Sequence, residues 1–269
     1  MKDKLGDRMK EFYENRTRYY LPRKTYTIIR LDGKAFHTWT KGLERPYDQA
    51  FSEVMDATTK ELCQKIQGAV FGYVQSDEIS IVAVDFGDKQ NTDAWFDGNI
   101  QKICSVSASM CTSIFNDKVA KYRYAADCSI NNKPSANFDS RVFIISDPVE
   151  VYNYFVWRQQ DATRNSISSG ARAFYSDKEC FGKSSSDLQE MMFQAGQNWN
   201  DYPARFKRGG LIFYDHQQVE GNAINKKTDE PVVFMRPIGW TIADESPIFT
   251  SQEGKIFINN LIPKKESDL

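Results

Sequence analysis

Apolar residues recur along the first half of the chain in two spacings, which predict alternating strands and helices. Residues 25–31 form a β-branched and aromatic run that stops at Asp32-Gly33, as a strand does at a turn. Residues 69–84 contain two more such runs around Gln75-Ser76-Asp77-Glu78, which predicts a hairpin with Asp77 and Glu78 at its tip. Residues 141–145 predict a further strand.

Helical spacing fills the intervals between these strands. Pro46 to Ile66 and Asn99 to Phe115 each carry one apolar stripe, with Pro46 suited to a first helical turn. The resulting βαββαβ order is that of a split βαβ, ferredoxin-like sheet, in which the first strand lies beside the central hairpin. The predicted fold class is therefore α+β, a ferredoxin-like βαββαβ palm of the polymerase type.

The second half of the chain predicts a mixed α/β region. Residues 149–160 and 188–195 have helical spacing, whereas residues 210–214 and 231–234 are strand-like and are expected to pair. We divide the chain into 1–147, a palm catalytic region with an N-terminal helix, and 148–269, a helical and strand region that packs on the palm.

Composition indicates a cytoplasmic protein. The 269 residues, 41% of them apolar, suffice for one large domain or two closely packed subdomains, and the net charge of −1 is unlike that of a DNA-coating protein. The five cysteines lack C-x-x-C spacing and there are only two histidines, which argues against a zinc site or disulfide framework. No signal peptide and no membrane-length apolar run is present, so no membrane partner is expected.

Two carboxylates carry the candidate chemistry. The predicted sheet brings Asp32 and Asp77 to neighbouring strand ends, and Mg²⁺ commonly binds one or two carboxylates together with substrate phosphates. Such a pair suits two-metal phosphoryl transfer. Either motif alone is also what an ordinary turn contains, and a palm fold alone does not select a function.

Several ordered motifs resemble the tRNA(His) guanylyltransferase family and its Thg1-like proteins, over residues 5–214. The motifs are Arg30-Leu31-Asp32-Gly33 with Phe36-His37, Gln75-Ser76-Asp77-Glu78, Arg45-Pro46 with Asp48, Phe138-Asp139 with Arg141, Trp157-Arg158-Gln159 with Asp161, Asn198-Trp199-Asn200, and Lys207-Arg208-Gly209. The resemblance implies a homotetrameric enzyme that adds nucleotides to the 5′ end of tRNA in the 3′-to-5′ direction, using GTP, ATP and other NTPs.

The resemblance also implies residue roles. Asp32 and Asp77 would ligate two Mg²⁺ ions, with the Gly33 carbonyl as a further ligand. Glu78 would support the metal site; its alternative is a solvent-facing charge at the hairpin tip. The candidates for nucleotide binding are Lys34, Phe36, His37, Arg45, Asp48 and Ser76. Three of these have an alternative role. His37 could be a structural residue packed beneath the loop, and Ser76 could stabilise the turn. Asp48 could recognise a guanine edge or could lie in the first turn of the helix.

RNA contacts are expected mainly from the second region. The candidates are Arg158, Asn165, Asn198, Lys207 and Arg208. Three basic segments could meet phosphates: one with Arg16, Arg18, Arg23 and Lys24, one with Arg158, Arg164 and Arg172, and one with Arg205, Lys207 and Arg208. The match departs from the family after Trp-Arg-Gln, where Thr163 replaces a histidine found in members specialised for tRNA(His). This departure resembles the Thg1-like branch, whose members are template-dependent repair polymerases.

Two other functions suit the same residues. A palm-type nucleotidyl cyclase or oligonucleotide synthetase would use the same metals on free nucleotides. A non-catalytic RNA-binding module can share the ferredoxin-like sheet, but RNP-type aromatic runs are absent from the sequence and Asp32 and Asp77 are intact.

Overall fold

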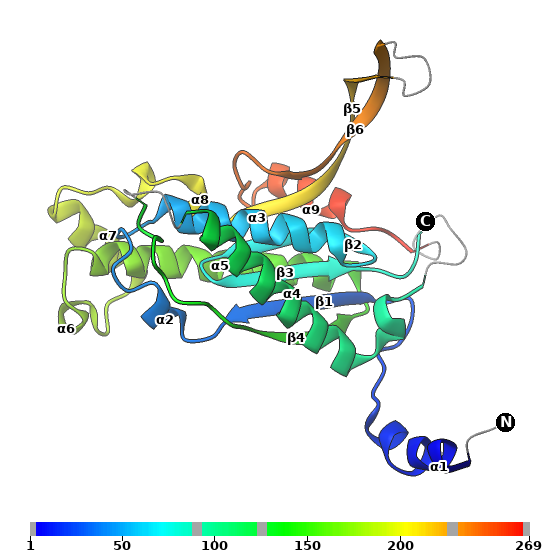
Figure 1. Cartoon of the computed structure of the whole chain (residues 1–269). Helices are drawn as coiled ribbons and strands as arrows, with labels where there is room; N and C mark the ends of the chain where they lie inside the picture. Colours follow the sequence, from blue (N-terminus) through cyan, green and yellow to red (C-terminus); the bar gives the residue numbers. More distant parts are fainter. Residues whose placement is uncertain (1–3, 88–92, 123–127, 225–230, 266–269) are drawn as a thin grey trace.

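A single antiparallel sheet organises the chain (Figure 1). The computed structural model describes residues 4–87, 93–122, 128–224 and 231–265. In these residues six strands lie in the order β4-β1-β3-β2-β5-β6. The strands are β1 (Tyr26–Gly33), β2 (Ala69–Gln75), β3 (Glu78–Ala83), β4 (Phe138–Ile145), β5 (Gly210–Ile224) and β6 (Pro231–Ile242).

The first four strands confirm the predicted palm. Their chain order is β1, α3 (Gln49–Lys65), β2, β3, α4 (Ile100–Lys121), β4, and their order in the sheet is that of a ferredoxin-like fold. β1 pairs with β3 so that Asp32 lies opposite Glu78, and on its other side β1 pairs with β4. This register brings the end of β1 next to the turn between β2 and β3.

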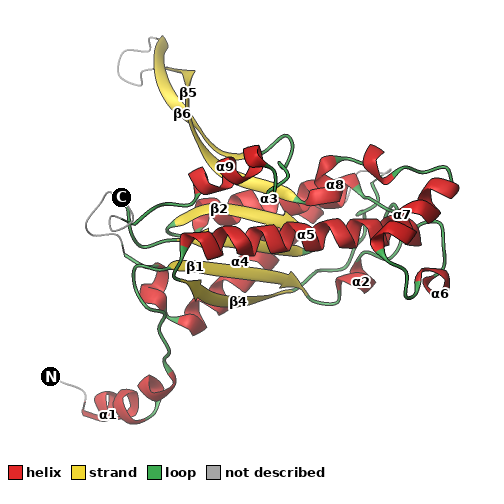
Figure 2. Ribbon diagram, turned by 180° about the vertical axis from the view of Figure 1, so that it is seen from behind, coloured by secondary structure: helices red, strands yellow, loops and turns green. Residues whose placement is uncertain are grey.

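Alternate residues of the central strands bury opposite faces of the sheet. Ile29 and Ile79 face a core to which α2 (Phe36–Trp39), α3 and α4 contribute, and α3 and α4 lie in front of the sheet in Figure 1. Ile28 and Val82 face a second core covered by α5 (Pro148–Arg172) and α9 (Gln252–Leu261), seen in Figure 2. Because both faces are covered, every residue of β3 is buried.

The remaining elements lie around this frame. α6 (Asp177–Cys180) and α7 (Ser185–Gln194) pack against the second half of α5, and α8 (Ala204–Arg208) leads into β5. α1 (Lys4–Phe12) and short 3₁₀ helices at Glu14–Thr17, Trp95–Gly98 and Trp199–Asp201 complete the described elements. All five cysteines are free, and none of the described helices has the length and apolar character that a membrane span requires.

Several predicted boundaries were wrong. α3 begins at Gln49 rather than at Pro46, because Asp48 caps the helix and Pro46 precedes it in a cis peptide bond. α5 continues twelve residues beyond Gln160 to Arg172. The predicted strands at 210–214 and 231–234 exist, but they lie at opposite ends of a longer ribbon, in which Tyr214 pairs with Trp240 and Ile224 with Pro231.

The long ribbon also places the second region within the sheet. β5 pairs with β2 from Phe213 to Gly210, so the sheet continues from the palm into β5 and β6. Beyond this pairing the two strands project from the body of the molecule as an arm (Figures 1 and 2). The division at residue 147 and the cytoplasmic location both stay predictions.

Candidate active site

Two carboxylates come together at one end of the sheet. Asp32 lies near the end of β1, and Asp77 lies in the turn that joins β2 to β3, one residue before the partner of Asp32. Burial, together with the negative charge of Asp32, raises the pKa of the Asp77 carboxyl to about 6. A positive charge at this point would relieve both effects.

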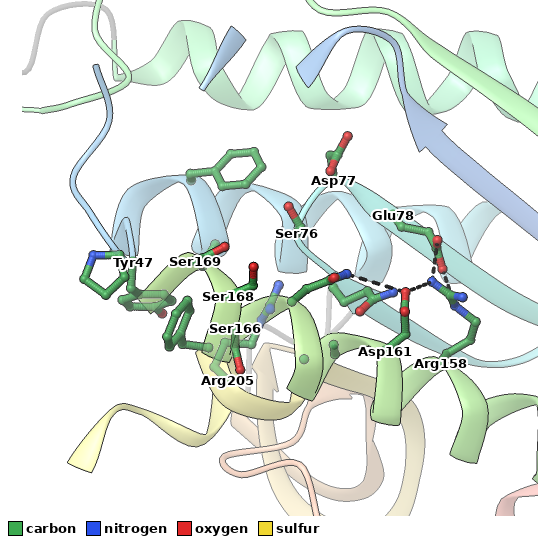
Figure 3. Close-up of a pocket in the computed structure, with 18 of the residues that line it drawn as sticks. Tyr47, Ser76, Asp77, Glu78, Arg158, Asp161, Ser166, Ser168, Ser169 and Arg205 are labelled. Carbon is green, nitrogen blue, oxygen red and sulfur yellow. Dashed lines mark hydrogen bonds and ion pairs between the residues drawn. The ribbon is translucent and has the colours of Figure 1, made fainter. Parts of the chain in front are cut away.

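The turn geometry fixes the direction of Asp77. Gln75 pairs with Glu78, so Ser76 and Asp77 are the two central residues of a tight hairpin turn. Ser76 has a φ of 46°, a left-handed conformation that glycine usually supplies in such turns. Backbone strain of this kind is often found at functional sites, and here it lies beside the carboxylate that faces the cavity (Figure 3).

The donor set fits Mg²⁺ bound together with a substrate. Within the described ranges, no cluster of three or more His, Cys, Asp or Glu residues is placed to hold a metal by itself. Mg²⁺ usually takes one or two carboxylates and fills its other positions with phosphate oxygens and water. Asp32, Asp77 and the adjacent Gly33 carbonyl are the oxygen donors at the strand end, which matches that pattern.

Glu78 is not a solvent-facing charge. Its side chain is buried, and Oε2 accepts hydrogen bonds from Arg158 Nη2 at 2.8 Å and Arg30 Nη2 at 2.5 Å. Arg158 Nε also lies 2.7 Å from Glu78 Oε1, without hydrogen-bond geometry. Both Glu78 oxygens therefore face arginines, so this residue holds the end of β3 in place beside Asp77.

Arg158 has a structural place that corrects its predicted RNA contact. Its side chain is only 4% exposed and also donates to Asp161 Oδ2 at 2.9 Å. A guanidinium buried in this way does not reach a phosphate backbone. Figure 3 shows the pairs between Arg158, Glu78 and Asp161 at one side of the cavity.

A cavity of about 580 Å³ opens beside the carboxylates. Its walls include Asp32, Ser76, Asp77, Tyr47, Trp157, Asp161, Asn165, Ser168, Ser169, Arg172, Arg205 and Phe206. A second cavity of about 290 Å³ shares Asp48, Ser76 and Arg172 with it and adds Arg45. The volume is that of a small-ligand site; Arg172 lines both cavities, Arg45 lines the smaller one and Arg205 the larger one.

The other residues of the predicted nucleotide loop are placed differently. Phe36 is buried and stacks on Trp39 with 5.3 Å between ring centroids, so the expectation that it binds a nucleotide is corrected to a core role. A Cβ on Gly33 would lie 2.2 Å from this ring, which explains the glycine. Lys34 and His37 are exposed and line neither cavity, and His37 contacts Thr38 Oγ1 at 3.0 Å.

Asp48 is a helix cap. Its Oδ1 accepts a hydrogen bond from Phe51 N at 2.9 Å and its Oδ2 accepts one from Glu44 N at 3.1 Å. Both carboxylate oxygens accept hydrogen bonds from backbone N–H groups, which favours a helix-capping role for Asp48 over recognition of a guanine edge. Ser76 lines both cavities and is exposed, so it is placed to meet a ligand there.

The predicted RNA-binding residues do not form one surface. Asn165 lines the larger cavity, whereas Asn198 caps the 3₁₀ helix at Trp199–Asp201 by accepting from Asn200 N. Lys207 Nζ donates to Asn200 O at 2.5 Å, and Arg208 Nε donates to Ser246 O at 3.2 Å. In the amino-terminal segment, Arg23 pairs with Asp85 and with two further carboxylates.

Sequence reasoning missed much of the cavity wall. Tyr47, Ser168 and Ser169 were not candidates, and Arg172 and Arg205 were expected only as members of RNA-contacting basic segments, although each of the five lines the cavity. The serines and Arg172 lie on the continuation of α5, whose apolar spacing is interrupted by buried polar residues. Arg205 is paired at 2.8 Å with buried Asp56, a contact between residues far apart in sequence. From Ala162 onward, small residues recur at every third or fourth position, and this helical spacing could have predicted that α5 continues.

Comparison with known proteins identifies a consistent set of relatives. Residues 6–146 match the family described as tRNAHis guanylyltransferase (Thg1). The tRNA(His) guanylyltransferase of Saccharomyces cerevisiae is 27% identical over 70% of this chain and 81% of its own length. An uncharacterized protein of Acanthamoeba polyphaga mimivirus is 30% identical over 64% of this chain, which spans 63% of the viral protein.

Solved structures give the same result over more of the chain. A bacterial tRNA(His) guanylyltransferase (Thg1)-like protein in complex with ATP is 39% identical, covers 96% of this chain and 99% of its own, and superposes with a TM-score of 0.79. Such a protein in complex with GTP is 38% identical, over 97% of this chain and 99% of its own, with a TM-score of 0.74. The structure of the tRNA(His) guanylyltransferase from S. cerevisiae is 25% identical, covers 75% of this chain and 92% of its own, and superposes with a TM-score of 0.63.

Proposed function

This chain belongs to the tRNAHis guanylyltransferase (Thg1) family, and we propose that it is a Thg1-like enzyme that adds nucleotides to the 5′ end of tRNA in the 3′-to-5′ direction. The observation that carries the proposal is the pair Asp32 and Asp77, at adjacent strand ends beside a cavity large enough for a nucleotide. A nucleotidyl cyclase or oligonucleotide synthetase would need the same pair, but the comparisons match tRNA guanylyltransferases over most of the chain.

Asp32, Asp77 and the Gly33 carbonyl would hold two Mg²⁺ ions. The chemistry that these ions supply when bound is charge neutralisation on the attacking and leaving oxygens of phosphoryl transfer. Asp77 is suited to this role because its burial disfavours a free charge, so a bound cation would favour its ionised form. Glu78, fixed by Arg30 and Arg158, keeps the turn in position without acting as a ligand.

The arginine side of the site suits a triphosphate. Arg45 and Arg172 both line the smaller cavity, and Arg172 and Ser76 also line the larger one, which contains Asp32 and Asp77. Tyr47 and Phe206 form an edge-to-face pair with ring centroids 5.6 Å apart, giving the larger cavity an apolar surface for a nucleobase. ATP and GTP are bound by the two bacterial relatives, and we extend both ligands and other NTPs to this chain.

Addition directed by the opposite strand is the second part of the proposal. Thr163 stands where family members specialised for tRNA(His) have a histidine, and it lies on α5 between Ala162 and Asn165, which line the cavity. The bacterial Thg1-like structures are also more similar in sequence than the yeast guanylyltransferase. We therefore propose repair of 5′-truncated tRNAs with little preference for tRNA(His).

A templating experiment tests this. Two tRNAs, tRNA(His) and one other, are each shortened by one 5′ nucleotide and made with each of the four bases opposite the gap. The proposal predicts that the added nucleotide follows the opposing base in both tRNAs. Addition of G to tRNA(His) alone, whatever the opposing base, would replace repair with non-templated guanylyl addition. Joining or cyclisation of free NTPs without incorporation into tRNA would favour the cyclase or synthetase alternative.

A further inference from the structure

Trp157 is an exposed aromatic residue at the edge of the catalytic cavity. Its side chain remains 47% exposed although the residues on either side of it in α5 pack into the fold. Covering the exposed part of an indole with a ligand removes apolar surface from water and is favourable. Nothing in the metal and triphosphate roles described above uses this ring.

One face of the ring is already covered. The Arg158 guanidinium carbon lies 4.4 Å from the Trp157 ring centroid, and Tyr154 packs against the indole edge-on, with 5.8 Å between ring centroids. Because Arg158 is itself buried against Glu78 and Asp161, it holds the indole in a fixed orientation. The exposed area of Trp157 therefore lies on the ring face opposite Arg158 and along the free edge, as in a preformed stacking platform.

Trp157 separates two surfaces of different character. On one side it lines the catalytic cavity, and on the other it lines a shallow groove of about 480 Å³. Among the described residues that line the groove there is no lysine or arginine, and Asp147 and Glu150 are present. Phosphate groups are disfavoured there, whereas Arg45 and Arg172 lie around the smaller cavity.

The different charges of the groove and of the smaller cavity suit different parts of the two substrates. Figure 3 shows Tyr47 and Arg158 toward opposite sides of the cavity, with Asp77 between them. A triphosphate directed at Arg45 and Arg172 places the NTP base near Tyr47 and Phe206. The end of the RNA must then reach the carboxylates from the side of the cavity opposite Tyr47, and Trp157 offers a neutral aromatic surface on that opposite side.

We infer that Trp157 is the stacking platform for the terminal base at the 5′ end of the RNA substrate. The inference rests on the proposed function and deepens it by naming the residue that positions the growing end. Stacking on an aromatic side chain accepts every base, as an enzyme that extends different 5′ ends requires.

The test compares RNAs that differ only in the terminal base. A 5′-truncated tRNA is prepared with a normal 5′-terminal nucleotide and with an abasic one, and both equilibrium binding and the KM for RNA are measured. Wild type, Trp157→Ala and Trp157→Phe are compared, with Phe181→Ala as control, because Phe181 is 88% exposed and lines neither the catalytic cavity nor the groove. Thermal unfolding of each variant checks that the fold is kept.

For the normal RNA, Trp157→Ala should weaken binding and raise KM about tenfold, Trp157→Phe should recover most of the loss, and Phe181→Ala should change neither. For the abasic RNA, wild type and Trp157→Ala should be equal. An equal loss on both RNAs would overturn the inference, since the ring would then act without contacting the base. A loss that instead follows removal of the NTP base would reassign the platform to the incoming nucleotide. Because RNA binding is measured without turnover, the inference is tested even if no nucleotide is added.

Discussion

At the scale of single residues, the carboxylate pair sets the pH behaviour of the metal-free protein. Burial raises the pKa of Asp77 from the usual value of 3.8 to about 6. Between these two pH values the folded protein binds more protons than the unfolded chain, so this group makes stability fall as pH rises through the window. Above pH 6 the folded state retains a buried, partly uncompensated charge.

Asp77→Asn should therefore stabilise the metal-free protein while abolishing nucleotide addition. We expect a gain of about 2 kcal/mol in the free energy of unfolding at pH 7.5 and almost none at pH 3.5. Urea unfolding in the presence of a chelator at both pH values measures the difference. An unchanged or lower stability at pH 7.5 would show that Asp77 is not under electrostatic strain.

Unlike Asp77, Glu78 is a buried carboxylate whose charge stabilises the fold, because it neutralises the positive charges of two arginines. Glu78→Gln leaves Arg158 buried without a full counter-charge, and we expect a loss of about 3 to 5 kcal/mol in the free energy of unfolding. The matched control is Glu61→Gln, which removes a half-exposed partner of Lys118 and Lys65 and should cost less than about 1 kcal/mol. Similar losses in the two variants, measured by urea unfolding, would show that the Glu78 cluster contributes no more than a surface pair.

At the scale of elements, the start of α3 depends on Asp48 more than on Pro46. Asp48→Ala removes the acceptors for Phe51 N and Glu44 N and should lower the free energy of unfolding by about 1 to 2 kcal/mol, whereas Asp48→Asn keeps most of the cap. Thermal unfolding measures both effects. Because both oxygens serve the backbone, Asp48→Asn should also leave the ratio of GTP to ATP use unchanged. A shifted ratio would restore Asp48 as a guanine-reading residue.

Local patterns predicted the palm because its strands alternate with well-marked helices. The turn residues after β1 and between β2 and β3 also gave the positions of Asp32 and Asp77 within one or two residues. Helix ends were harder, since the second half of α5 buries Ser166 and lacks a strong apolar stripe. α9 was not predicted; its core contact is Ile258, which packs beneath α5 only through the tertiary fold.

Side-chain roles were predicted less well than backbone positions. Arg158 and Phe36 belong to motifs typical of the family, and the sequence does not show that both side chains are buried. Their burial depends on partners distant in the chain, such as Glu78 for Arg158 and Phe138 for Phe36. A charge or a ring in a motif therefore indicates importance, but only the fold distinguishes a ligand contact from a support.

At the scale of the whole molecule, the arm formed by β5 and β6 carries exposed apolar side chains far from the cavity. They are Ile224, Val232, Val233, Phe234, Met235 and Ile238. An apolar surface of this kind on a projecting element is typical of a protein contact. We propose that copies of the chain meet through it in the homotetramer that the resemblance to the family implies.

Charged substitutions on one side of the arm test this assembly. Val233 and Met235 lie two residues apart on β6 and so share a face. If the expected tetramer forms through this face, the double variant Val233→Glu with Met235→Glu should convert it to smaller species, because two carboxylates would be buried in the contact. Sedimentation velocity measures the change. The control is Phe181→Ala, which removes an exposed ring elsewhere. A double variant that sediments as wild type would exclude the arm as the contact, and a fully active wild-type monomer would exclude the tetramer.

Asp32 and Asp77 are the residues on which the proposed nucleotide addition at the 5′ end of RNA depends most directly. The most direct measurement is a single-turnover reaction of wild type, Asp32→Asn and Asp77→Asn with Mg²⁺, a labelled NTP and a 5′-truncated tRNA, followed by mapping of the labelled end and by RNA binding for each protein. We predict label at the 5′ end with wild type, none with either variant, and similar RNA binding by all three. Label at the 3′ end, or near-normal addition by both variants, would contradict the account.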